Sequence, residues 1–191
     1  MPSPSAAAEV ARELLEPLGQ RWQHTVAVAA RAADLSLAVP AEDSDLLIVA
    51  AWWHDLGYAP DARQTGMHQI DGASYLAGLG YSERLCALVA HHSAAECEAE
   101  QRGLLSELRR WQRERSATAD ALWMADMTTG PSGEPFDYTA RLAEILDRYD
   151  SSSVVGRAMT SAQPLISAAI SRTTARLQAA GSGDFWPLTF G

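Results

Sequence analysis

The chain has 191 residues, of which 47% are hydrophobic, enough for one domain with a sizeable core but tight for two. All fifteen basic residues are arginine, which excludes any mechanism that depends on a lysine. The net charge of −9 argues against a general nucleic-acid binder or a protein that binds anionic membranes, because such proteins carry a basic surface. A local arginine pocket for one phosphorylated small molecule is compatible with this charge.

The cysteines and the N-terminal segment indicate the compartment. Cys86 and Cys97 lack CxxC spacing and suit free thiols in a reducing cytosol. Residues 1–8 lack the charged start and the apolar stretch of a signal peptide, and no apolar run approaches eighteen residues. We therefore expect a cytoplasmic protein without a membrane-spanning segment.

Apolar residues recur at helical spacing and never alternate over a long stretch, which predicts an all-α protein. Glycine, proline and capping residues predict helices over residues 5–16, 20–37, 42–56, 67–80, 82–93, 117–127 and 138–149. One or two further helices are expected over 151–180, interrupted at Pro164. The remaining segments are expected to be a disordered leader (1–5), a loop at the rim of the site (57–66), a solvated charged helix (96–115), a second loop (128–137) and a loose tail (181–191).

We expect one helical domain with three parts. Residues 1–19 form a leader and first helix, residues 20–130 form a core, and residues 131–191 form a helical extension packed on the same domain. The sequence does not indicate an oligomeric state.

The run from Leu46 to Trp53 is apolar on every side, which predicts a buried central helix. It leads directly into His54 and Asp55, and Gly57 is expected to end the helix just beyond them. Burying an unpaired carboxylate costs several kcal/mol, so Asp55 needs a metal ion, another cation or several hydrogen-bond donors beside it.

Every histidine of the chain lies on or beside an apolar helical stripe. A single histidine in such a place is usually a core residue, but five histidines and two aspartates on five predicted helices favour a metal site. Helical spacing places His92 on the inward stripe and His91 one position to the side. The candidate ligands are His24, His54, Asp55, His68, His91, His92 and Asp126.

In chain order, His24, the pair His54–Asp55 and Asp126 resemble the HD superfamily of metal-dependent phosphohydrolases, which have an all-helical core. The resemblance covers residues 20–130 and includes the segment 50–57, which is similar to the helix that carries the family's His-Asp pair. His68 and the pair His91–His92 resemble the additional histidines of binuclear members. The resemblance implies one ion held by His24, His54, Asp55 and Asp126, and a second held by His68 and either His91 or His92, with Asp55 bridging.

The resemblance implies hydrolysis of a nucleotide or another phosphorylated small molecule by metal-activated water, with Asp55 and His54 at the catalytic centre. One or two divalent ions are expected, among Fe, Mn, Zn, Co, Ni and Mg. Arg21 and Arg63 are the candidates for holding the phosphate, and Tyr58 is a candidate for stacking on a base. Two alternatives stay open: a di-iron oxygenase with the same fold, and a non-catalytic module that binds a metal or a nucleotide.

The sequence also departs from the family in two places. Many HD hydrolases carry a lysine shortly after the His-Asp pair, whereas Gly57 is followed by Tyr58 here. His92 leads into Ser93 and not into the Gly-Tyr-Pro signature of cyclic-di-GMP phosphodiesterases, so we exclude that activity.

Overall fold

The computed structural model describes residues 1–181, and within this range the chain forms α-helices and short 3-10 turns without a β-strand. This confirms the all-α prediction. From residue 182 onward, the predicted tail lies outside the described residues. The α-helices are α1 (Pro4–Leu15), α2 (Gln20–Asp34), α3 (Ser44–Trp53), α4 (His68–Gly78), α5 (Glu83–Ala90), α6 (Ala95–Arg102), α7 (Leu105–Leu108), α8 (Ala117–Met127), α9 (Tyr138–Arg148) and α10 (Val154–Ala179).

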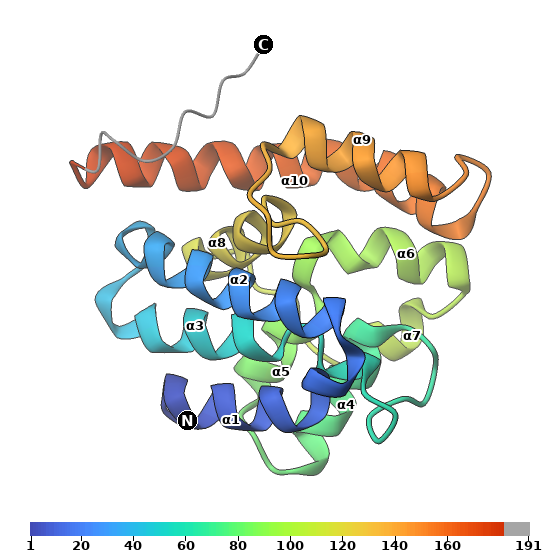
Figure 1. Ribbon diagram of the computed structural model, residues 1–191, viewed down its shortest axis with the longest axis horizontal. Coiled ribbons are helices and arrows are strands. Elements are labelled where there is room, and N and C mark those ends of the chain that lie inside the picture. The colour runs from blue at the N-terminus through green and yellow to red at the C-terminus, as the bar shows by residue number, and fades with distance from the viewer. Residues whose placement is uncertain (182–191) are drawn as a thin grey trace.

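The helices pack around α3 and α8. Helix α3 lies between α1 and α2 and also contacts α5 and α8 (Figure 1). Helix α10 runs along the upper side of the molecule and packs on α8, α6 and α9. None of the helices in residues 1–181 has the length and apolarity that crossing a membrane requires.

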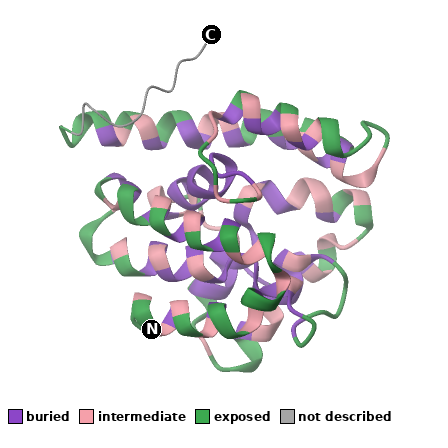
Figure 2. Cartoon of the chain, in the orientation of Figure 1, coloured by how far each residue is buried: buried purple, intermediate pink, exposed green. Residues whose placement is uncertain are grey.

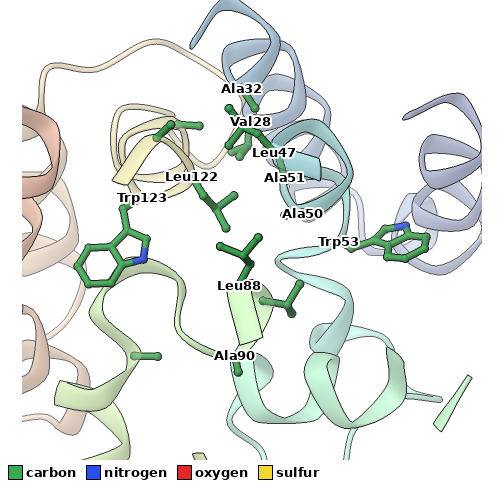
Figure 3. Packing of buried hydrophobic residues seen from close by; sticks show 14 of the residues in the cluster. Val28, Ala32, Leu47, Ala50, Ala51, Trp53, Leu88, Ala90, Leu122 and Trp123 are labelled. Atoms are coloured by element: carbon green, nitrogen blue, oxygen red, sulfur yellow. The ribbon is translucent and has the colours of Figure 1, made fainter. Parts of the chain in front are cut away.

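The core consists of the side chains that these helices share. Buried residues concentrate on α3, α5 and α8, while the outer faces of α1, α2 and α10 are exposed (Figure 2). Val28 of α2, Leu47 of α3, Leu88 of α5 and Leu122 of α8 point into the same interior (Figure 3). Burial of one such side chain contributes about 1.5–3 kcal/mol. The core therefore gives the His-Asp segment that follows α3 a rigid support.

Helix α3 ends at Trp53, earlier than the predicted end at Leu56. The Nδ1 of His54 donates a hydrogen bond to the carbonyl of Ala51 at 2.7 Å, and the chain then turns into the 3-10 segment η4 (Leu56–Tyr58). His54 and Asp55 thus leave the helix axis toward α4 and α8. Gly57 does not act as a helix stop, because its φ is not positive.

Other predicted segments also differ from the structure: α2 ends at Asp34 and α5 at Ala90, both earlier than predicted. Helix α1 begins at Pro4, because Ser3 caps it by accepting a hydrogen bond from the backbone N–H of Ala6 at 3.3 Å. Helix α10 continues through Pro164, whose exposed position lets solvent reach the carbonyl that lacks a helix N–H partner. The charged segment 96–115 is not one helix, since Gly103 adopts φ +71 and separates α6 from α7.

Gly57 allows η4 to approach the first turn of α4. A Cβ at this position would lie 1.9 Å from the carbonyl oxygen of His68 and 2.7 Å from the backbone nitrogen of Gly72. Because backbone atoms cannot move aside cheaply, we predict that Gly57→Ala lowers the free energy of unfolding by at least about 2 kcal/mol in urea titrations. Gly78→Ala is the control, because a Cβ added at Gly78 would have no atom within 4 Å. Equal effects of the two substitutions would contradict this account.

Asp43 joins the start of α3 to two other helices. It accepts hydrogen bonds from Arg84 at 2.7 and 2.5 Å and from the hydroxyl of Thr118 at 2.7 Å. The bonds from Arg84, outweighing burial, lower the pKa of Asp43 below its ordinary value of 3.8. A lowered folded-state pKa stabilises the fold above the unfolded pKa, and this stabilisation is lost as the pH falls through the folded pKa.

We therefore predict that Asp43→Asn destabilises the protein by about 1–2 kcal/mol at pH 7. The difference from the wild type should shrink as the pH falls below 3.8, as measured by urea unfolding at a series of pH values. The exposed Asp45, which forms no ion pair among the described residues, is the control, and Asp45→Asn should change stability by less than about 0.5 kcal/mol. A destabilisation by Asp43→Asn that does not depend on pH would contradict the ionic role of Asp43.

Candidate metal centre

Six of the seven predicted ligands come together between α2, α3, α4, α5 and α8. They form two groups, and within each group one ligand atom from every residue lies within 4.8 Å of the others. The first group is His24, His54 and Asp126, and the second is Asp55, His68 and His92.

The first group lies where α2 and α8 meet the end of α3. The Nε2 of His24 is 3.1 Å from Oδ1 of Asp126 and 3.4 Å from Nε2 of His54. The Nε2 of His54 is 3.9 Å from the same oxygen of Asp126. Two imidazole nitrogens and one carboxylate oxygen therefore converge on a common point.

The second group joins the first turn of α4 to the end of α5. The Nε2 of His68 is 3.2 Å from Nε2 of His92 and 3.3 Å from Oδ1 of Asp55. The other oxygen of Asp55, Oδ2, faces the first group, at 3.3 Å from Nε2 of His54 and 3.8 Å from Nε2 of His24. Asp55 thus presents one oxygen to each group.

Backbone carbonyls fix the orientation of three of these imidazoles. The Nδ1 atoms of His24, His54 and His92 donate to the carbonyls of Gly130, Ala51 and Val89 at 3.0, 2.7 and 2.7 Å. When such an imidazole is neutral, its Nε2 carries a lone pair directed at the cluster. The Nε2 of His24 donates a hydrogen bond to Asp126 when it carries a proton, and without that proton it offers its lone pair to a bound cation. The donor set therefore fits a divalent metal ion.

Burial and the mutual charges of the cluster control its ionisation. Burial by itself raises the pKa of Asp55, but Arg21 and His54 outweigh burial and hold it well below its usual range. In the same way, burial raises the pKa of Asp126, and the hydrogen bond from His24 and the charge of His54 more than reverse this. The cluster thus holds two ionised carboxylates that are both buried.

The histidines respond to this negative charge differently. Burial lowers the pKa of His68 and of His92, with the neighbouring histidines adding to the effect, so these imidazoles are neutral at pH 7, as metal ligands must be. For His54, burial acts in the same direction, but Asp55 and Asp126 outweigh it and raise the pKa to about 9. The first group therefore attracts positive charge, whether a proton or a metal ion.

His91 is not part of the cluster. Its Nε2 donates to the backbone carbonyl of Trp111 at 2.8 Å, and it belongs to neither group of ligands. The chain places His92 inward because α5 ends at Ala90, where His91 becomes the helix cap. The two residues that follow, Ser93 and Ala94, adopt left-handed φ values of +49 and +59.

Two residues near the cluster were not predicted from the sequence. The hydroxyl of Ser93 donates a hydrogen bond to Oδ2 of Asp126, which orients that carboxylate. Arg141 of α9 is buried beside the cavity and pairs with Glu144, and its Nε has no hydrogen-bond partner among residues 1–181. No local signal marks either residue, because the position of Ser93 depends on an unusual backbone turn and Arg141 lies on an ordinary amphipathic helix.

Five of the six ligand residues, all but His54, line a cavity of about 320 Å³. Arg21, Tyr58 and Arg63, the predicted substrate-binding residues, all line this cavity. The Nη1 of Arg21 donates to Oδ2 of Asp55 at 2.6 Å, and the Arg21 guanidinium lies over the Tyr58 ring at 4.1 Å. The Tyr58 ring in turn stacks on His68 with a centroid distance of 4.2 Å. Arg63 is exposed on the loop after η4.

The fold and the cluster together define an all-helical protein with a His-Asp centre suited to metal ions. A family model described as HD domain matches residues 21–152, which is more than half of the chain. The chain therefore belongs to the HD-domain family, most of whose members are metal-dependent hydrolases. Neither the curated proteins nor the solved structures compared with the chain gave a match.

The two groups predict how metal content responds to substitution. We expect about two ions per chain in the wild type, about one in the double variant His68→Ala/His92→Ala, and a loss of metal from the first group in Asp126→Ala. The measurement is elemental analysis of purified protein after dialysis with manganese. His91→Ala is the control, because His91 lies next to His92 in the sequence but outside the cluster, and it should retain about two ions. An unchanged metal content in the double variant would contradict the assignment of Asp55, His68 and His92 as a metal site.

Proposed function

We propose that the protein is a metal-dependent phosphohydrolase that acts on a phosphorylated small molecule. The observation that carries the proposal is the shared position of Asp55, which presents one oxygen to each ligand group in a cavity lined by arginines. Such a site can bind a phosphate with both metal and guanidinium contacts. In this proposal His24, His54 and Asp126 hold one ion, His68 and His92 hold a second, and Asp55 contacts both.

Divalent ions held by these residues would supply Lewis acidity to phosphate oxygens and lower the pKa of a bound water. The water oxygen forms a bond to phosphorus, the bond from phosphorus to the ester oxygen breaks, and one proton of the water passes to the leaving oxygen, so that a phosphate monoester gives phosphate and an alcohol. The chain's own residues prepare this reaction in three ways. Backbone carbonyls hold the imidazoles in place, Ser93 orients Asp126, and the Tyr58 ring covers one face of His68.

The arginines have distinct roles in this proposal. Arg21 holds Asp55 in place through one nitrogen and has further N–H donors, and its side chain is 31% exposed. Burial lowers the pKa of Arg21, but Asp55 and Tyr58 more than compensate, so the guanidinium stays charged. Arg63 makes no ion pair among the described residues and can bind a phosphate oxygen without first losing a partner.

The test is release of inorganic phosphate from a panel of phosphomonoesters, phosphodiesters and nucleotides in the presence of added Mn²⁺. We expect release from at least one class by the wild type and a loss of about 100-fold or more in His54→Gln and Asp126→Asn, since both remove a ligand. His91→Gln should retain activity close to that of the wild type. Absence of release from the whole panel by protein that contains metal would contradict the proposal.

A further inference from the structure

The cavity beside the ligand groups has an apolar wall that the proposed hydrolysis does not use. Four residues of α10 line the cavity at the spacing i, i+3, i+4 and i+7, which places them on one face of the helix. They are Val155, Ala158, Met159 and Ala162. Helix α10 thus presents an apolar stripe to a cavity that is also lined by ligand residues and five arginines.

Two other helices add apolar side chains to this wall. Met127, which follows Asp126 on α8, and Ile145 of α9 line the same cavity. Val155 and Met159 are only partly buried although both pack against the core, so part of their apolar surface faces the cavity. Covering this surface with hydrocarbon would be favourable.

The charged residues near the apolar wall are paired. Arg102 donates to Glu98 at 2.7 Å, and Arg148 and Arg141 both pair with Glu144. These three guanidiniums face only two carboxylates, so one positive charge stays unbalanced, but each arginine already has an ion-pair partner with which a second or third phosphate of a nucleoside polyphosphate would compete. Arg63 lines the same cavity as the ligand groups and has no ion-pair partner among residues 1–181.

We propose that the ligand of this site is a phosphate monoester of an apolar alcohol, with alkyl or aryl character. Its phosphate lies at the ligand groups near Asp55, and its hydrocarbon part lies along the α10 stripe. The cavity of about 320 Å³ matches the size of sites for small organic ligands. This inference rests on the proposed function for the position of the phosphate. It adds that the rest of the ligand is apolar.

Alkylphosphonates test the inference, because their C–P bond resists the proposed hydrolysis and binding can be measured alone. The probes are methyl-, butyl- and hexylphosphonate, titrated calorimetrically into the protein with added Mn²⁺. We expect the dissociation constant to fall by up to about fourfold for each methylene that is buried. Val155→Thr/Met159→Gln should reduce this gain and leave the affinity for methylphosphonate unchanged, which also shows that the variant is folded.

Val154→Thr/Leu165→Gln is the matched control, because these residues lie on the same helix and do not line this cavity. In this control, affinity should rise with the length of the phosphonate's alkyl group as much as in the wild type. Should the double variant fail to bind methylphosphonate, Met159→Gln alone replaces it. The inference would be overturned if all three phosphonates bound with equal affinity. It would also be overturned if affinity rose with alkyl length as much in Val155→Thr/Met159→Gln as in the wild type.

A parallel assay separates this inference from the proposed function. Hexyl phosphate is incubated with the wild type and Mn²⁺, and phosphate release is measured. If affinity rises with the alkyl length of the phosphonate but no phosphate is released from hexyl phosphate or from the wider panel, the result supports the ligand class and contradicts the proposed hydrolase function. Release from nucleotides without any gain in phosphonate affinity would support the hydrolase and contradict the ligand class.

Discussion

The structure depends on the burial of two ionised carboxylates, Asp55 and Asp126, inside a helical core. Neither could stay charged there without compensation, because desolvation alone favours the neutral acid. Arg21 and His54 stabilise the charge of Asp55, and His24, His54 and the hydroxyl of Ser93 stabilise that of Asp126. Arg21 alone does not balance two carboxylates, and the elevated pKa of His54, about 9, shows that the site attracts further positive charge. A metal ion in each group would satisfy the same requirement and would explain why the imidazole Nε2 atoms converge.

Much of this site could be predicted because it follows from local patterns. The apolar runs of α3 and α8 each end in a carboxylate, and a buried carboxylate demands a partner whatever the tertiary structure. The bounds of α8 agree with the predicted helix at both ends, because Ser116 caps its start and the apolar run ends with it. Helical spacing favours His92 over His91 as the inward residue, but in the structure the end of α5 at Ala90 determines this, and the sequence could not show that His91 binds the carbonyl of Trp111.

The features that sequence reasoning missed depend on contacts between distant segments. Gly57 was predicted to end a helix. In the structure, its lack of a side chain allows η4 to pack closely against the backbone of His68 and Gly72, a contact that the sequence does not show. The left-handed turn at Ser93 and Ala94 has no glycine to mark it. Helix α10 had no predicted function, since its stripe is ordinary for a core-facing helix until packing on α8 and α9 places it at the cavity. The division of the chain at residues 19 and 130 stays a prediction, although the family match extends to residue 152.

The central claim is that two groups of residues each hold a metal ion and share Asp55. Anomalous diffraction from crystals of the protein grown with Mn²⁺ tests this most directly, because it locates each ion among its ligands. The account predicts two peaks, one among His24, His54 and Asp126 and one beside His68 and His92, with the Asp55 carboxylate contacting both. A single peak, or peaks only outside these six residues, would contradict it.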